Sequence, residues 1–77
     1  MNEAQAIQAV LLTREQAAMV CGCSLRQWDR LAASQRTPAP VYLGRRRRWR
    51  RTELEAWAAA GLPDRRAWET LRREGRA

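Results

Sequence analysis

The chain has 77 residues and a formal net charge of +7, and all 15 of its basic residues are arginines. A chain of this length folds as one domain with a small core and has little room for an enclosed substrate pocket. Guanidinium groups bind phosphate through paired hydrogen bonds and also bond guanine edges. The charge therefore indicates a polyanionic partner, although G+C-rich coding DNA remains an alternative explanation for the absence of lysine.

The arginines are concentrated in one part of the chain. From Arg30 to Thr52 the sequence holds eight arginines and no acid, whereas five of the eight acids follow Thr52. Segregation of one sign of charge on a small domain is typical of proteins that bind polyanions. A solvated surface that only confers solubility is the alternative, but such surfaces usually mix both signs of charge.

The residue content gives no support to several other classes of function. Histidine is absent, and the sequence contains no nucleophile elbow, phosphate loop or carboxylate cluster, so we expect no enzyme activity, cofactor or small-molecule substrate. Cys21 and Cys23 are too few to close a zinc site and too near in sequence for an unstrained disulfide, which predicts two core residues. The sequence shows no signal peptide and no apolar run of about 18 residues, which predicts a cytoplasmic, nucleoid-associated protein without a membrane partner.

The first two helices are predicted from their capping residues. Residues 1–11 are expected to form a flexible arm, and the domain is expected to begin with Leu12. Thr13 and Gln16 have the spacing of a capping box, and Gly22 suits the left-handed position after a helix end, which predicts a helix over 13–21. Ser24 then caps a second helix over about 25–34. Two helices joined by about three residues must cross steeply, as in a helix-turn-helix.

The second predicted helix separates its side chains into two faces. Leu25, Trp28 and Leu31 fall on an inward apolar face. The outward side chains are the candidates for contact with bases and phosphates, because glutamine can bond adenine and arginine can bond guanine. These candidates are Ser24, Arg26, Gln27 and Arg30. Asp29 lies at the boundary, where we expect it to orient Arg26 or an arginine of the following hairpin.

The stretch 38–51 predicts a β-hairpin. Two prolines impose extended backbone, and a strand over 41–43 follows, with Val41 and Leu43 inward and Tyr42 outward. Residues 44–46 are predicted to form the turn, and the strand over 47–50 returns with Trp49 inward. The candidate contacts in this hairpin and the loop before it are Arg36, Tyr42, Arg45, Arg46, Arg48 and Arg50.

Two further helices are predicted near the C-terminus. Thr52 and Glu55 have capping-box spacing, which predicts a helix that ends near Ala60. A break at 62–64 follows, and Asp64 is expected to cap a last helix over about 65–74 whose arginines are solvated. Trp68 and Leu71 lie three residues apart on that helix, where they either close the core or bind a partner. The domain boundaries are therefore placed at 12–61 and 62–77.

Short segments in a characteristic order run from Leu12 to Ala59. They are Leu12-Thr13, Gln16-Ala17-Ala18, Gly22-Cys23-Ser24, Trp28-Asp29-Arg30-Leu31, Pro38-Ala39-Pro40-Val41, Leu43-Gly44-Arg45, Arg48-Trp49-Arg50 and Glu53-Leu54-Glu55-Ala56-Trp57. In order and spacing they resemble the excisionase and AlpA-like group of small winged helix-turn-helix proteins, which is related to the MerR-type DNA-binding domain and is encoded by phages and genomic islands. Cys21 and Cys23 stand where the group usually has Leu and Val.

The resemblance implies a mainly α fold with a two-stranded β-hairpin wing, in the order α-α-β-β-α with an added C-terminal helix. It implies that the second helix enters the major groove of double-stranded DNA and that the wing lies along the minor groove. By position, Arg45 and Arg46 would form the wing tip, and Arg48 and Arg50 would grip the DNA backbone. Further implied partners are copies of the chain on adjacent repeats, and an integrase.

Three functions remain open from the sequence. The first is an excisionase-like recombination directionality factor that binds and bends attachment-site DNA. The second is a small transcriptional regulator of the AlpA type, which would need the same fold and the same arginines. The third is an interaction module whose basic hairpin contacts an acidic protein or RNA.

Overall fold

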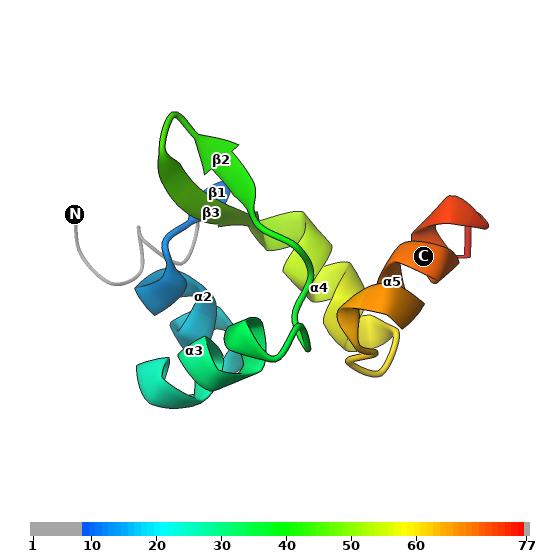
Figure 1. Cartoon of the computed structure of the whole chain (residues 1–77), viewed down its shortest axis with the longest axis horizontal. Coiled ribbons are helices and arrows are strands. Elements are labelled where there is room, and N and C mark those ends of the chain that lie inside the picture. The colour runs from blue at the N-terminus through cyan, green and yellow to red at the C-terminus, as the bar shows by residue number, and fades with distance from the viewer. Residues whose placement is uncertain (1–8, 77) are drawn as a thin grey trace.

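The computed structural model describes residues 9–76. Over this range the chain forms four helices and a three-stranded antiparallel sheet, as Figure 1 shows. The elements are β1 (Leu11–Leu12), α2 (Arg14–Cys21), α3 (Leu25–Ala33), β2 (Val41–Leu43), β3 (Arg46–Arg50), α4 (Arg51–Ala59) and α5 (Arg65–Arg73). None of the helices within this range is long and apolar enough to cross a membrane. The predicted mixture of helices with a small hairpin is confirmed, whereas a sheet of only two strands was wrong.

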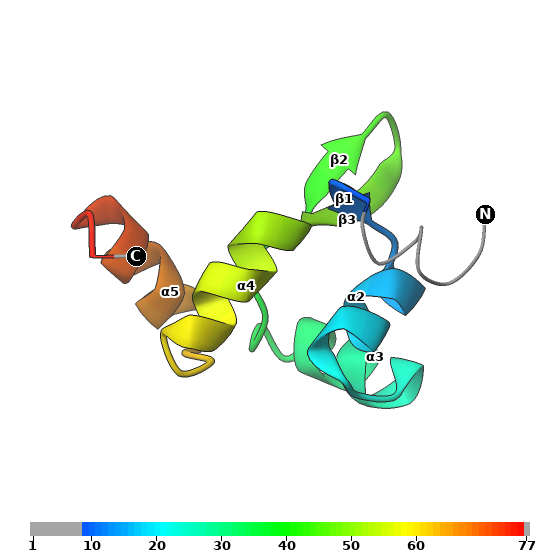
Figure 2. The same ribbon diagram turned by 180° about the vertical axis from the view of Figure 1, so that it is seen from behind.

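The third strand comes from the end of the predicted N-terminal arm. The strand order is β1-β3-β2, with Leu11 opposite Arg50 and Leu12 opposite Trp49. The side chain of Leu12 is fully buried, and its burial brings the preceding residue to the edge of β3. Residues 1–8 of the predicted arm lie outside the described range, but Leu11 belongs to the sheet, so the arm cannot extend to residue 11. Figure 2 shows β1 lying beside β3 at the base of the hairpin and continuing into α2.

The helix starts follow the predicted caps at three of four positions. The Thr13 hydroxyl accepts from the Gln16 amide at 3.1 Å, and the Gln16 side chain accepts from the Thr13 amide at 2.9 Å. Ser24 and Asp64 each accept from a backbone amide three residues later. Gly22 takes the left-handed conformation after α2, with φ of 73°. These caps satisfy amide groups that a helix leaves free at its start.

The predicted cap at Thr52 is wrong. Helix α4 already begins at Arg51, and its N-cap residue is Arg50, whose side chain makes no capping hydrogen bond. The reason is that β3 passes into α4 without a loop, because the Arg51 amide donates to the Val10 carbonyl at 3.0 Å beside β1. In the first turn of α4, the carboxylate of Glu53 accepts hydrogen bonds from α5.

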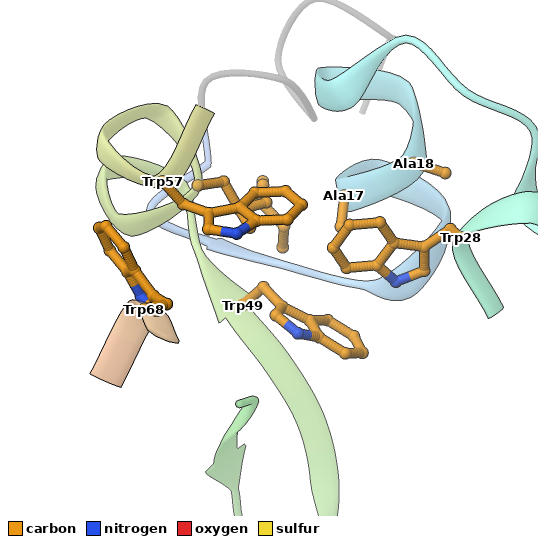
Figure 3. Packing of buried hydrophobic residues seen from close by; sticks show 8 residues of the cluster. Ala17, Ala18, Trp28, Trp49, Trp57 and Trp68 are labelled. Atoms are coloured by element: carbon orange, nitrogen blue, oxygen red, sulfur yellow. The ribbon is translucent and has the colours of Figure 1, made fainter. Parts of the chain in front are cut away.

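The core is built on the four tryptophans of the chain. All of them are buried: Trp28, Trp49, Trp57 and Trp68. The rings of Trp28 and Trp49 meet edge to face, with centroids 5.2 Å apart and planes at 83°, a favoured aromatic geometry. Figure 3 shows this pair beside Ala17, with Trp57 and Trp68 on the α4 side. The Trp28–Trp49 pair therefore joins α3 to the root of the hairpin.

Helix α5 packs onto this core through Trp68, which is 1% exposed. The Trp68 indole donates to Glu53 Oε2 at 3.0 Å, and Arg72 lies over the ring while bonding the same oxygen. Leu71 is half-buried against the same cluster. The alternative in which Trp68 is an exposed partner surface is therefore wrong, and the residue closes the core.

Arg65 at the start of α5 fixes the loop that leaves α3. Its amide donates to the Gln35 carbonyl at 3.0 Å, and its Nε donates to the Thr37 carbonyl at 3.0 Å. Gln35 has a positive φ of 59°, a conformation that costs a non-glycine residue about 1 kcal/mol or more. Arg65 was expected to be solvated, and instead it holds the connection between α3 and β2.

Candidate nucleic-acid interface

Helix α3 presents its polar stripe to solvent. The four predicted side chains on this helix and its cap, Ser24, Arg26, Gln27 and Arg30, are all exposed. On the opposite side, Trp28 is fully buried against Trp49. No salt bridge within residues 9–76 engages Arg26 or Arg30. The stripe therefore lies on a firmly packed helix, and the N–H donors of Arg26 and Arg30 remain available to a ligand.

Asp29 pairs with an arginine that the sequence did not suggest. Its carboxylate accepts from Arg14 Nη1, so the first turn of α2 is tied to α3. Asp29 was expected to orient Arg26 or a hairpin arginine, and that expectation is wrong. No local sequence pattern predicts this contact, because the two residues are 15 positions apart and meet only when the helices cross.

The hairpin turn is tighter than predicted. Leu43 pairs with Arg46, which leaves only Gly44 and Arg45 in the turn, and Gly44 has a φ of 66°. A two-residue turn needs positive φ at its first position, which glycine adopts without strain. Arg45 therefore stands at the tip, whereas Arg46 is the first residue of β3 rather than part of the tip.

The strand register reverses the predicted faces of β2. Cross-strand partners share a face of a sheet, and the partners are Val41 with Arg48, Tyr42 with Arg47, and Leu43 with Arg46. Since faces alternate along β3, Tyr42 and Arg47 lie on the face of Trp49, while Val41 and Leu43 lie on the other. Leu43 is 58% exposed, so the prediction that Leu43 and Val41 face inward with Trp49 is wrong.

The remaining residues that the sequence predicts to contact DNA differ in their exposure and in the contacts that they make within the protein. Tyr42 and Arg50 are exposed on the sheet, and Arg36 is exposed in the loop after α3. Arg48 is half-buried, and its Nη1 donates to the Arg47 carbonyl at 2.8 Å. The Arg47 guanidinium lies 5.6 Å from the centre of the Trp49 ring, an arrangement in which the ring face attracts the cation.

The sequence predicts no role for Arg47, although it contains a signal for the position of this residue. Residues two apart on a strand share a face, so Arg47 had to lie beside Trp49. With Arg14, Arg46 and Arg48 it lines an open groove, which Thr13, Glu15 and Trp49 complete. The groove holds four arginines and one carboxylate, so it continues the basic surface from the hairpin to the start of α2.

The two cysteines do not behave alike. Both thiols are free; Cys23 packs against the core as predicted, whereas Cys21 is exposed at the end of α2 and is not a core residue. Partial burial of the thiol, with a smaller contribution from Cys23, raises the pKa of Cys21 from 9.0 to about 11. Over residues 9–76 no three Cys, Asp or Glu side chains gather as metal ligands.

The α3 stripe and the β2–β3 hairpin occupy separate parts of the molecule, with α2 between them (Figure 1). Figure 1 shows the hairpin projecting from the helices, the α2–α3 pair on one side of its base, and α4 leading away on the other. Comparison of the chain with protein-family models, with curated proteins and with solved structures finds no match. The functional interpretation therefore rests on the geometry of these surfaces and on the sequence resemblance.

Proposed function

We propose that the chain is a sequence-specific, double-stranded DNA-binding protein of the winged helix-turn-helix type. The observation that carries the proposal is the exposed stripe Arg26, Gln27 and Arg30 on α3, a helix anchored by the buried Trp28. An α-helix fits the major groove of B-DNA, where these side-chain types can bond guanine and adenine. In this proposal α3 is the recognition helix and the β2–β3 hairpin is the wing.

The wing supplies affinity rather than sequence information. Five arginines and no acid occupy residues 45–50, and Arg45 stands exposed at the tip. Contacts to phosphates position a protein on DNA without reading sequence. Because each neutralised phosphate releases counterions, binding should weaken steeply as salt rises.

The narrower biological role follows from the resemblance. We assign the chain to DNA recombination as an excisionase-like directionality factor that binds several adjacent repeats in an attachment site, bends the DNA and directs an integrase. A module this small buries little DNA, so several copies would be needed for a selective complex. A transcriptional regulator of the AlpA type would use the same surface and differ only in where its sites lie.

The first experiment is selection of a preferred duplex from a random pool by the full chain, followed by fluorescence anisotropy with that duplex and with a scrambled one. We expect a preferred site, and we expect Arg26→Ala to weaken binding to it by about 1–3 kcal/mol while scarcely changing binding to the scrambled duplex. Arg73→Ala is the matched control, because Arg73 is an exposed arginine of α5 whose side chain bonds only Thr70 within residues 9–76.

Two outcomes would contradict the proposal. Equal losses on both duplexes would show that α3 does not read bases. Single-stranded RNA or an acidic protein that displaced the duplex completely at equal concentration would favour the interaction module instead. Protection mapping then separates the two DNA roles, since sites within an attachment region support excision and sites over a promoter support regulation.

A further inference from the structure

The groove between β3 and the start of α2 exists because β1 is short. Strand β1 ends at Leu12, opposite Trp49, and the chain then turns away into α2. Within the described residues, the edge of β3 beside Arg46 and Arg47 therefore has no strand neighbour on that side. The groove fills this space, and it is lined by side chains from both elements.

The lining of the groove is basic, because four of its seven residues are arginines. Three consecutive arginines of β3 line it together with Arg14 of α2, and Glu15 is the one acid among the lining residues. Arg14 is held by Asp29 and Glu15, with 42% of its side chain exposed, so part of its guanidinium remains available. Arg47 is held along Trp49, and Arg48 is held by the Arg47 carbonyl. Three of the four guanidinium groups are thus placed by protein contacts before any ligand arrives.

Backbone donors lie beside these guanidinium groups. The capping box uses the amides of Thr13 and Gln16, whereas the amides of Arg14 and Glu15 take no acceptor among residues 9–76. The first amides of a helix attract anions, and here they border a groove that arginines line. Preorganised guanidinium and amide donors around one open site match the tetrahedral oxygens of a phosphate.

We infer that this groove binds one phosphodiester group of the DNA backbone, between the segment contacted by α3 and the segment contacted by the hairpin tip. The inference rests on the proposed function, and it assigns phosphate contacts to Arg47 and Arg14, which lie outside both the recognition stripe and the tip. The groove also fixes the spacing along the duplex between α3 and the hairpin tip, because Arg14 is tied to α3 through Asp29 and Arg47 belongs to the hairpin.

The test uses the full chain, a preferred duplex and a scrambled duplex, with affinity measured over a range of salt concentrations. Arg47→Gln should weaken both duplexes equally and reduce the slope of log affinity against log salt by about one, the expectation for one lost phosphate contact. Arg73→Gln removes the same charge from α5 and should leave the slope near that of the unchanged chain. Circular dichroism checks that both variants are folded.

A second measurement reports on the groove without DNA. Titration of the 15N-labelled chain with inorganic phosphate at low salt should shift the amide signals of Arg14 and Glu15 and the Nε signal of Arg47. In Arg47→Gln the amide shifts should shrink, and in Arg73→Gln they should persist.

The outcomes separate this inference from the proposed function. A chain that binds its preferred duplex normally, with the same salt slope in Arg47→Gln and Arg73→Gln, would overturn the groove and leave the proposed function intact. A phosphate titration that shifts other amides instead of those of Arg14 and Glu15 would also overturn it. An unchanged chain that fails to bind any duplex would overturn the proposed function and the phosphodiester assignment together.

Discussion

Helix α3 and the β2–β3 hairpin both carry exposed arginines, but they differ in how firmly they are packed against the core. The arginines of α3 project from a helix whose opposite side is a fully buried indole. The hairpin is buried only at its root, through Trp49, and its outer half exposes both Tyr42 and Leu43. The difference teaches that exposed arginine alone does not define a role, because a rigid support suits base recognition and an exposed ribbon suits phosphate contact.

The largest expected effect concerns the pair of rings that joins the two regions. Trp49→Ala should lower the free energy of unfolding by about 3–5 kcal/mol, since it leaves a large cavity against Trp28. Urea denaturation followed by circular dichroism measures the change. In a domain this small the loss should remove DNA binding through both regions at once.

A milder pair of variants keeps this prediction testable if the alanine variant fails to fold. The Trp49 indole donates to the Pro38 carbonyl at 3.1 Å, whereas Trp28 Nε1 has no acceptor among residues 9–76. Trp49→Phe should therefore destabilise the fold more than Trp28→Phe does. The reverse order would show that the hairpin root does not depend on this hydrogen bond.

The next effect should distinguish the proposed base contact of α3 from the proposed phosphate contact of the hairpin. Gln27→Ala should cost about 1–3 kcal/mol on the preferred duplex and little on a scrambled one, because it removes the proposed base contact. Arg45→Gln should weaken both duplexes alike and lower the salt slope by about one. Salt-dependent anisotropy measures both quantities. If the two variants gave the same profile, the division of labour between helix and hairpin would be wrong.

A smaller effect concerns the loop that links the two regions. Arg65→Met keeps the aliphatic stem but removes the Nε donor to the Thr37 carbonyl, and we expect a loss of about 1 kcal/mol in unfolding free energy. Arg66→Met is the matched control, because Arg66 is the exposed neighbour on α5. Equal unfolding midpoints for the two variants would show that Arg65 does not hold the loop.

The smallest effect contrasts the turn before α3 with the turn of the hairpin. The pKa of Cys21 is raised to about 11 by burial and by Cys23, so the folded state keeps this proton at a pH where the unfolded chain loses it. The contribution of Cys21 to stability is therefore complete below pH 9 and declines as pH rises toward 11. Denaturation across this range should show a shallower decline for Cys21→Ala, whereas Gly44→Ala in the hairpin turn should leave the pH dependence unchanged.

The elements that sequence predicted well are those with local signals. The starts of α2, α3 and α5 follow from Thr13, Ser24 and Asp64, because a capping side chain and its amide lie three residues apart. The exposed stripe of α3 follows equally from helical spacing around Trp28. These features needed no knowledge of distant parts of the chain.

The elements that sequence missed depend on distant partners. Strand β1 is two residues long and is defined only by pairing with Trp49 and Arg50, so no local pattern reveals it. The same pairing starts α4 one residue before the apparent cap at Thr52. The faces of β2 follow from register with β3, and a three-residue strand has too few positions for its own pattern to set that register. The sequence did not predict Arg14 as a site residue, because its position depends on Asp29, a partner in another helix.

The short strand β1 also sets an order of events during synthesis. Leu12 is fully buried, yet its strand partner Trp49 lies 37 positions further along the chain, and pairing across such separations forms late in folding. A nascent chain that ends before Trp49 has both α2 and α3 complete but lacks the ring against which Leu12 and Trp28 pack. The helix pair is therefore synthesised before its support, and the core cannot close until Trp57 and Trp68, which follow residues 46–50, have also been made.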